Sequence, residues 1–210
     1  MLWTLIVLSG FLVATILDPV AQSWLANREG GVLEFRHRIE QWGWYGVFRA
    51  LGTVLAWGLL ALAFLSHDRV ALADRAWRER HRRAERLILA SIAGGAAAEI
   101  LKLILRRERP GASELLYSFK PLGEGLLSST NVGLPSSHAA VAFAGATLLA
   151  LAAPWSAPVA FAAAAGCGLT RILAGAHHVS DVYAAGVVGI ICARWVWSFG
   201  RPRSPMDILP

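Results

Sequence analysis

The sequence predicts an all-α membrane protein, a single domain over residues 1–210 that forms a bundle of about six transmembrane helices. Hydrophobic residues make up 56% of the chain and charged residues only 16%. A soluble domain carries about 25% charged residues, so this chain has too few charges to cover a water-facing surface. The nine Trp and 20 Gly also suit closely packed membrane helices with aromatic belts at both interfaces.

Six stretches are apolar and close to the roughly 20 residues that a membrane helix needs. They are Met1–Leu17, Trp44–Ser66, Leu87–Leu105, Ser137–Ala153, Val159–Gly175 and Val182–Ser198. The first stretch lacks a positively charged start, and no convincing small-x-small cleavage site follows it. We therefore expect a retained helix rather than a cleaved signal peptide.

Between the first two stretches, apolar residues recur at helical spacing among charged ones over Val32–Trp42. This pattern is typical of an amphipathic helix that lies in the membrane interface. An ordinary solvated connector explains it equally well, and the sequence leaves both readings open.

Seven of the 18 arginines lie between Arg69 and Arg86, in the connector after the second stretch. A short basic run beside two membrane helices is typical of the positive-inside signal rather than of a nucleic-acid patch. With this connector in the cytoplasm, six helices put both termini inside. The connectors at about 106–136 and 176–181 then share the outer face. The net charge of +6 thus predicts an orientation, and we expect no nucleic-acid partner.

The first polar cluster on the outer side follows the third stretch. Lys102 and Arg109 are seven residues apart, about two helical turns, so they share a face if the helix continues. An ionisable group near the end of an apolar helix is costly and usually has a function. Glu99, three residues before Lys102, is a candidate partner for it. Arg106 and Arg107 are explained more simply by snorkelling of their side chains to the interface.

The second cluster, Pro135-Ser136-Ser137-His138, stands at the start of the fourth stretch. Proline followed by serine marks a helix start. The free N–H groups and the positive end of the helix dipole at such a start bind anions. A histidine in this first turn can exchange a proton with the bound group. A plain serine cap with a structural histidine would give the same pattern, so the cluster alone leaves both readings open.

The third cluster joins Arg171, at the end of the fifth stretch, to His177 and Asp181. The histidine and the aspartate are spaced i,i+4, so one helical turn would bring them together. The carboxylate could then fix the tautomer of the imidazole and free its other nitrogen to attack. A His–Asp pair alone is often only a structural hydrogen bond.

The three clusters together bring cations, a helix N-terminus and imidazoles to one membrane face. This combination suits an anion with several oxygens, such as a phosphate. Asp181 is the only carboxylate in the second and third clusters, so the residues lack an acidic group suited to Mg²⁺ or Ca²⁺. We therefore expect charge neutralisation by Lys and Arg, with no metal and no cofactor.

The motifs read Lys102-x6-Arg109-Pro110, then Pro135-Ser136-Ser137-His138, then Thr170-Arg171-x5-His177-x3-Asp181. In order and spacing they resemble the type 2 phosphatidic acid phosphatase (PAP2) superfamily, whose members share a site architecture with vanadium haloperoxidases. The family pattern is K-x6-R-P, P-S-G-H and S-R-x5-H-x3-D. The resemblance covers roughly residues 86–200 and implies a PAP2/chloroperoxidase-like helical core there.

The resemblance also implies a role for each motif residue. His177 would be the nucleophile that forms a phosphohistidine, and Asp181 would orient and polarise it. His138 would protonate the leaving oxygen and then act as base for water. The substrate phosphate would be held by Lys102, Arg109, Arg171, Ser136 and the backbone N–H of Ser137 or His138.

The chain departs from the family pattern at four positions. Ser137 replaces the usual Gly, Thr170 the usual Ser and Val179 a frequent Pro, while His178 takes a position that is often aromatic. Ser137 matters most, because its Cβ could crowd the phosphate unless the backbone φ is already negative.

The function expected from these observations is a metal-independent lipid phosphatase of a bacterial cytoplasmic (inner) membrane, with its active site facing outward to the periplasm. Its substrate would be a lipid phosphate or prenyl diphosphate. Candidates are phosphatidate, phosphatidylglycerophosphate, undecaprenyl diphosphate and phosphorylated lipid A, and the sequence does not choose among them or predict an oligomeric state. An intramembrane serine protease is an alternative, but it leaves Lys102, Arg109 and Arg171 unexplained. A non-enzymatic transporter or channel, with its charges along a path, is the other.

Overall fold

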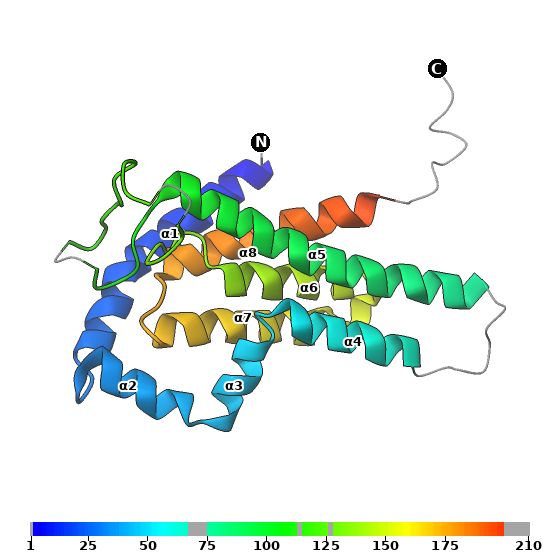
Figure 1. Cartoon of the computed structure of the whole chain (residues 1–210), viewed down its shortest axis with the longest axis horizontal. Helices are drawn as coiled ribbons and strands as arrows, with labels where there is room; N and C mark the ends of the chain where they lie inside the picture. Colours follow the sequence, from blue (N-terminus) through cyan, green and yellow to red (C-terminus); the bar gives the residue numbers. More distant parts are fainter. Residues whose placement is uncertain (1, 67–74, 113–114, 126–127, 200–210) are drawn as a thin grey trace, which may run out of the picture.

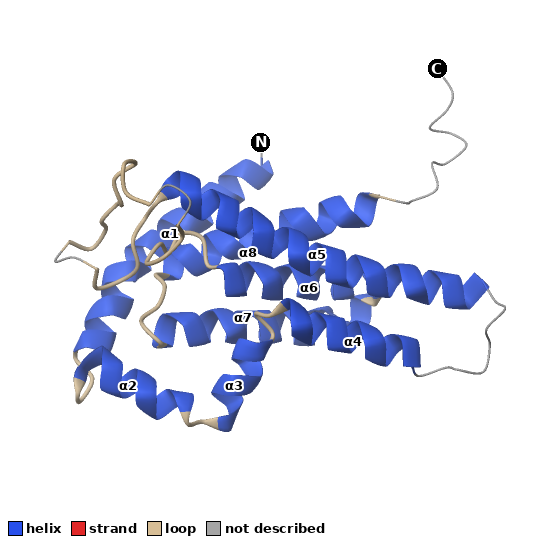
Figure 2. Cartoon of the chain, in the orientation of Figure 1, coloured by secondary structure: helices blue, strands red, loops and turns tan. Residues whose placement is uncertain are grey.

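The computed structural model describes residues 2–66, 75–112, 115–125 and 128–199, with the backbone alone for residues 64, 66 and 75–80. The described residues form helices and no strands, which confirms the expected all-α fold (Figures 1 and 2). In chain order the helices are α1 (Leu2–Ala26), α2 (Gly31–Glu40), α3 (Gly43–Ala50), α4 (Val54–Ser66), α5 (Arg75–Leu105), α6 (Ser137–Ala152), the 3₁₀ turn η1 (Pro154–Ser156), α7 (Ala157–Leu173) and α8 (Val179–Ser198).

Four of the described helical segments are long and apolar enough to cross a membrane. They are Leu2–Ala26, His81–Leu105, Pro154–Leu173 and Val179–Ser198. α3 and α4 pass the same test only as a pair bent by 83°. α6 has 16 residues, about 24 Å of helix, which is shorter than the hydrocarbon core of about 30 Å. The structure therefore has four or five candidate spans where the sequence predicted about six.

The short helix α6 lies at the centre of the bundle and packs against α5, α7 and α8. It is apolar on all sides, as a helix enclosed by others must be, and most of it is buried from Ala139 to Leu148. Glycines let its neighbours approach closely. A Cβ on Gly94 of α5 would lie 2.9 Å from the Ala140 carbonyl oxygen, and one on Gly189 of α8 would lie 2.5 Å from it. Small residues thus set the helix spacing around α6.

The predicted stretch Trp44–Ser66 is not one straight helix. It breaks at Gly52 and Thr53, because Thr53 is a good first cap for a new helix. The Thr53 hydroxyl accepts the Ala56 N–H at 3.3 Å, and the Trp57 indole N–H donates to the Leu51 carbonyl at 2.8 Å across the break.

The segment expected to be either an interfacial helix or a connector is helical as α2. Its residue Ile39 is fully buried in a small cluster with Tyr45, Ala174 and Ala176. α2 is thereby fixed to the loop that follows α7, while Leu33 on its other side is 79% exposed.

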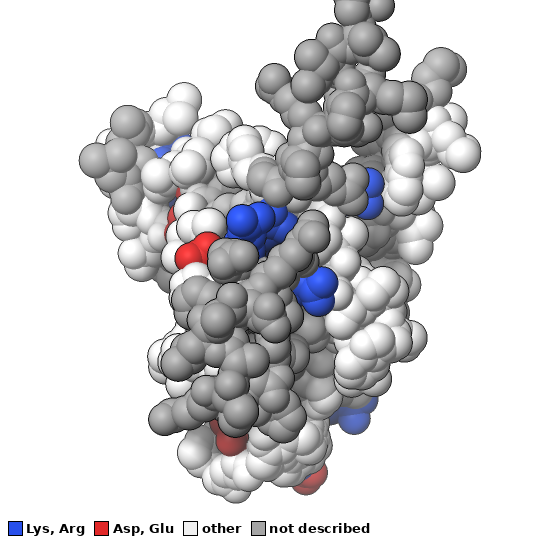
Figure 3. All heavy atoms as spheres, turned by 90° about the vertical axis from the view of Figure 1, so that its right-hand side faces the viewer, with Lys and Arg blue, Asp and Glu red and all other residues white. Residues whose placement is uncertain are grey.

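Most of the arginine run between residues 69 and 86 falls on side chains outside the described residues. The described members Arg82, Arg83 and Arg86 lie on the first turns of the apolar part of α5. Figure 3 views this end of the molecule and shows basic side chains near its middle.

Candidate active site

The site lies at the end of the bundle opposite to the start of α5, on the left in Figure 1, where α5 and α7 end and α6 and α8 begin. The two helix starts are joined directly, because the Ser136 N–H donates to the Asp181 carbonyl at 3.2 Å. All three sequence clusters contribute residues to this end.

α5 ends at Leu105, so the helix does not continue from Lys102 to Arg109. Arg106 takes a positive φ of 54° and turns the chain. Its side chain is 3% exposed and donates to the carbonyls of Lys120 at 3.0 Å and Pro121 at 2.7 Å. The snorkelling expected for Arg106 is wrong: this guanidinium holds the α5–α6 loop.

Residues 106–109 form a short strap with one arm of the loop on each side. On one side the Lys120 N–H donates to the Arg106 carbonyl at 2.9 Å, and the Glu108 N–H donates to Ser118 at 2.8 Å. On the other side the Gly133 N–H donates to the Arg107 carbonyl at 2.7 Å. The loop is therefore fastened at its base and leads directly into the start of α6.

Arg107 is also buried, 5% exposed, and the snorkelling expected for it is wrong as well. Its guanidinium donates to the Ser180 hydroxyl at 2.8 Å and forms a short ion pair with Asp181 Oδ1. The Tyr117 ring lies 5.0 Å from the guanidinium carbon, a cation–π distance. Arg107 thus neutralises the carboxylate at the start of α8.

Lys102 reaches the start of α6 from the last turn of α5. Its ammonium donates to Glu99 at 2.7 Å and to the Ser137 hydroxyl, and that hydroxyl in turn donates to Glu99. Ser137 is the first residue of α6 and has negative φ, so its Cβ requires no strained backbone. Glu99 therefore partners Lys102, and the serine that replaces the family glycine joins the two.

Three further candidates for phosphate binding carry buried polar atoms without a partner. Within the described part of the chain, these include Arg109 Nε, Ser136 Oγ and Arg171 Nε. Buried polar groups are nearly always hydrogen-bonded, so each such atom calls for an explanation. Two guanidinium N–H donors and a hydroxyl with unused capacity match the oxygens of an anion.

His177 is held by a backbone carbonyl. Its Nδ1 lies 2.9 Å from the Gly133 oxygen, and the residue is 3% exposed. Because a carbonyl oxygen only accepts, Nδ1 carries the proton, and the lone pair is on Nε2. This tautomer is the one that leaves a nucleophilic nitrogen on the side away from Gly133.

Asp181 lies beside His177, but the short contacts of its carboxylate are elsewhere. Its Oδ2 is 3.7 Å from His177 Nδ1 and accepts the His178 N–H at 2.8 Å. A Cβ on Gly133 would approach this same oxygen to 3.0 Å. Asp181 therefore acts on His177 as a nearby negative charge, while the Gly133 carbonyl accepts the hydrogen bond from Nδ1–H.

The adjacent histidine points away from this group. His178 Nδ1 accepts from the Gln22 amide of α1 at 2.9 Å, and its ring stacks on Tyr117 with centroids 5.2 Å apart. Two neighbouring histidines thus have different surroundings: Arg171 and Arg109 act on His177, whereas Arg107 acts on His178.

His138 sits in the first turn of α6, partly buried, and Arg171, His177 and Lys102 are close enough to act on it electrostatically. A Cβ on Gly52, at the α3–α4 break, would lie 2.7 Å from the His138 Cβ. The bend between α3 and α4 therefore lets the chain pass close to this histidine.

The electrostatic environment favours a neutral His177. Burial lowers the pKa of this imidazole below its ordinary value, the carboxylate of Asp181 opposes the shift, and Arg171 and Arg109 lower the pKa further. At neutral pH the Nε2 lone pair is therefore available.

Sequence reasoning missed four residues of this region: Asp18, Arg107, Tyr117 and Gly133. Asp18 carried a usable signal, because it is an acid inside an apolar helix and such groups rarely lack partners. The other three carried none, since their positions depend on the turn at Arg106 and the course of the loop.

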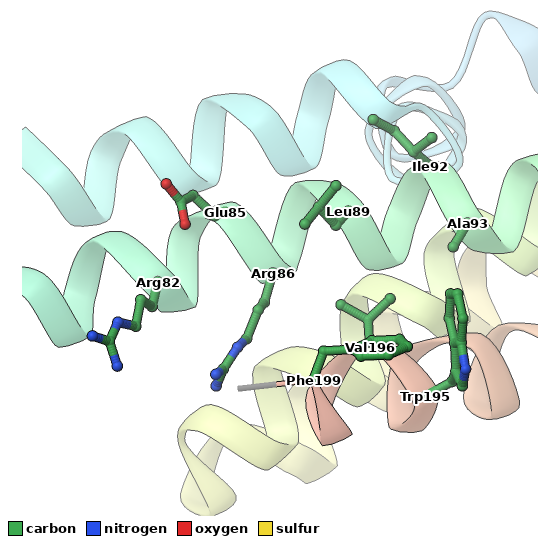
Figure 4. A pocket seen from close by; sticks show the side chains of 9 residues that line it. All are labelled: Arg82, Glu85, Arg86, Leu89, Ile92, Ala93, Trp195, Val196 and Phe199. Atoms are coloured by element: carbon green, nitrogen blue, oxygen red, sulfur yellow. The ribbon is translucent and has the colours of Figure 1, made fainter. Parts of the chain in front are cut away.

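One cavity of about 480 Å³ lies elsewhere, between α5 and α8 (Figure 4). It is lined by Arg82, Glu85, Arg86, Leu89, Ile92, Ala93, Trp195, Val196 and Phe199. These residues occupy the opposite ends of α5 and α8 from Lys102 and Asp181, so this cavity is separate from the candidate site.

The family model for the PAP2 superfamily matches residues 84–205 of the chain. The search of curated protein sequences found no match to this chain. Among solved structures, the chain is similar to a transmembrane PAP2-type phosphatidylglycerolphosphate phosphatase from Bacillus subtilis. The TM-score is 0.57 at 16% identity, over 95% of this chain and 96% of that one. It is also similar to LpxE from Aquifex aeolicus, with a TM-score of 0.53 at 23% identity, over 83% of this chain and 99% of that one.

Proposed function

The chain belongs to the PAP2 superfamily, and we propose from its site that it hydrolyses a phosphomonoester or diphosphate headgroup of a membrane lipid through a phosphohistidine, without a metal. The phosphate would be bound at the outer face of a bacterial inner membrane, and the lipid tail would stay in the bilayer. The two solved relatives include a phosphatidylglycerolphosphate phosphatase, so lipid phosphates are the first substrates to test.

The observation that carries this proposal is that two arginines, with buried N–H groups unpaired among the described residues, act on an imidazole whose tautomer leaves Nε2 free. Arg109 and Arg171 each keep a buried N–H without a partner, and both act electrostatically on His177. The imidazole has its proton on Nδ1 and its lone pair on Nε2. A phosphoryl group with its oxygens on the two guanidinium groups would present phosphorus to that nitrogen.

In the first step, the Nε2 lone pair of His177 attacks phosphorus, and the bond to the lipid oxygen breaks. The leaving oxygen takes a proton from His138, which must be protonated for this step. Burial and the charges of Arg171 and Lys102 disfavour that form in the free site, so the bound phosphate has to supply the opposing charge. Asp181 stabilises the positive charge that develops on His177, and the Gly133 carbonyl keeps its ring in place. Lys102, with the two arginines, balances the charge on the phosphoryl oxygens.

In the second step, His138 is neutral and accepts a proton from water, whose oxygen attacks the phosphohistidine. The P–N bond breaks, its electron pair returns to Nε2, and inorganic phosphate leaves. His138 is protonated again, ready for the next cycle. Among the described residues no three His, Cys, Asp or Glu side chains are grouped to hold a metal ion, which supports a mechanism in which Lys and Arg supply the positive charge.

The test is phosphate release from purified protein in detergent, over phosphatidate, phosphatidylglycerophosphate, undecaprenyl diphosphate and phosphorylated lipid A. We expect His177→Ala to lower release at least about a thousandfold while the protein stays folded in the membrane. His178→Gln should stay within about tenfold of the parent, because that side chain faces α1. Acid-labile phosphate trapped on the parent, and missing from His177→Ala, would identify the intermediate.

Four outcomes would contradict the proposal. Full activity of His177→Ala on every lipid phosphate would show that His177 is not the nucleophile. Loss of activity on chelation, with recovery on adding Mg²⁺, would overturn the metal-independent mechanism. Labelling of Ser136 or Ser137 by a fluorophosphonate, or solute flux in liposomes without phosphate release, would favour the protease or the transporter instead.

A further inference from the structure

Asp18 is a buried carboxylate in the apolar helix α1, with 0% of its surface exposed. It lies outside the residues that the family model matches, and the mechanism above does not use it. An ionisable group at such a position is costly unless it is fully partnered. α1 lies against α8, and Figure 1 shows the two helices side by side near the start of α8.

The Asp18 carboxylate accepts hydrogen bonds from donors at the site end of the molecule. Its Oδ1 accepts the Ser180 N–H at 3.0 Å. Its Oδ2 accepts both the Ser180 hydroxyl and the Tyr117 hydroxyl, the latter at 2.8 Å. Burial and the hydrogen bond to Asp18 raise the pKa of Tyr117 to about 12, so this phenol keeps its proton and donates. An ionised carboxylate can only accept hydrogen bonds, and these three donors balance the buried charge of Asp18.

These contacts continue to the catalytic histidine through a relay of named atoms. The Ser180 hydroxyl donates its hydrogen bond to Asp18, so its oxygen is free to accept one from Arg107 at 2.8 Å. The same guanidinium pairs with Asp181 Oδ1, and Asp181 Oδ2 lies 3.7 Å from His177 Nδ1.

The Ser180 contact limits how far Arg107 can move. Without an acceptor at Ser180, the guanidinium would keep its ion pair with Asp181 and its contact with the Tyr117 ring, and among the described residues only the His178 N–H would oppose a rotation of the carboxylate away from His177. A rotation of this kind moves a charge relative to the reacting ring, and small displacements of catalytic groups are costly. Asp18 is therefore connected to the Asp181 carboxylate through the Ser180 hydroxyl and Arg107.

We propose that Asp18 is a positioning residue of the active site: through Ser180 and Arg107 it fixes the Asp181 carboxylate beside His177, so that α1 is part of the catalytic apparatus. This inference rests on the proposed function of His177 as nucleophile. Gln22, one turn after Asp18 on the same face of α1, holds His178 at 2.9 Å and supports it. α1 thus contacts the first turn of α8 at Ser180 and the loop residue just before that helix, His178.

The experiment compares Asp18→Asn, Ser180→Ala and the double variant with Ser23→Ala. Ser23 is an exposed α1 residue whose hydroxyl bonds only within its own helix, so its loss is a matched control. Asparagine keeps the shape of Asp18 and an acceptor for the Ser180 N–H, but it turns a donor toward the two hydroxyls. The readouts are kcat, KM, and the number and affinity of orthovanadate sites per protein.

We expect kcat of Asp18→Asn and of Ser180→Ala to fall about 10- to 100-fold, the usual effect of removing a partner behind a reactive group. KM and orthovanadate affinity should change by less than about twofold, because the phosphate-binding residues are untouched. The double variant should lose no more than the larger single loss, since both residues act through Arg107.

Full kcat in Asp18→Asn would overturn the inference, and so would a fall in kcat that matches a fall in the number of orthovanadate sites, which is the mark of a structural role only. If Asp18→Asn does not fold, Ser180→Ala decides by the same readouts. If His177→Ala is inactive and Asp18→Asn is fully active, the proposed function stands and the positioning role of Asp18 fails. If His177→Ala is active, the proposed function fails, and the positioning role that rests on it fails as well.

Discussion

At the scale of single residues, the site depends on how one imidazole is distinguished from its neighbour. His177 bonds to a backbone carbonyl and faces cations, while His178 is engaged by α1 and Tyr117. Two identical side chains thus differ in which ring nitrogen carries the proton and in the groups that they contact. The chemistry of the site is decided by Gly133, whose missing side chain allows Asp181 to approach within contact of the backbone.

The acidity of His177 predicts how activity depends on pH. Burial and the nearby arginines lower the pKa of this imidazole. It therefore stays neutral even when the pH falls below the ordinary histidine pKa of about 6.5. The value of kcat/KM should therefore hold as pH falls past 6.5 and decline only at lower pH, where His177 gains a proton. Profiles for two substrates whose phosphates have different pKa values would separate this limb from substrate ionisation. A limb centred above 6.5 for both would contradict it.

Glu99 and Ser137 predict a tuning of phosphate affinity. Glu99 occupies the ammonium of Lys102 in the described structure, so a substrate phosphate must compete with it. Glu99→Gln should lower KM by up to about fivefold, since partly exposed ion pairs contribute up to about 1 kcal/mol. Ser137→Gly removes the hydroxyl that bonds both side chains but leaves their direct ion pair, so it should lower KM by less than Glu99→Gln does.

The matched control for this pair is Glu85→Gln, which makes the same charge change at the opposite end of α5. Its exposed carboxylate pairs with His81 at 3.3 Å, far along the helix from Lys102. A rise in KM for Glu99→Gln, with Glu85→Gln unchanged, would mean that Glu99 orients the lysine instead of competing for it.

At the scale of helices, apolar length and helix-start residues predict most elements, because a membrane leaves the backbone few choices. The ends of α5 and α7 and the starts of α6 and α8 follow from the motifs. Three features could not be predicted. The bend at Gly52 and Thr53 interrupts a stretch long and apolar enough for a single span, the turn at Arg106 falls on a residue type that seldom takes a positive φ, and the direction of Arg107 depends on that turn.

The close packing of α5 on α6 predicts a stability difference between two glycines. Gly94→Val should lower the unfolding temperature in detergent clearly, because even its Cβ would lie 2.9 Å from the Ala140 carbonyl oxygen. Gly58→Ala in α4 meets nothing within 4 Å and improves helix propensity by about 1 kcal/mol, so it should be neutral or stabilising. Equal unfolding temperatures for the two variants would show that α5 can yield at this contact.

At the scale of the whole molecule, the chain separates its charges by end. The phosphate-binding candidates lie where α6 and α8 begin, and the described arginines 82, 83 and 86 lie at the other end of α5. This separation is what the positive-inside rule, together with a need for cations at the proposed site, would produce. The sequence predicted both groups by position alone, since a membrane helix carries a residue to one face or the other.

The proposed orientation can be measured by cysteine labelling in cells. In a background with Cys167 and Cys192 replaced by Ala, Gly123→Cys should react with a membrane-impermeant maleimide from outside. Gly123 is exposed, with ordinary φ and nothing within 4 Å. Arg83→Cys, at the other end, should react only after the cells are made permeable. The reverse pattern would turn the proposed active site toward the cytoplasm.

The strap of residues 106–109 has a consequence for how such enzymes diverge. Both arms of the α5–α6 loop are hydrogen-bonded to the strap, and the stretches around Gly111 and 121–125 extend from it into solvent. Insertions or exchanges at those tips leave the fastened base, and the helix starts behind it, unchanged. A headgroup that contacts those tips could therefore be exchanged for another while the proposed reactive histidine stays in place.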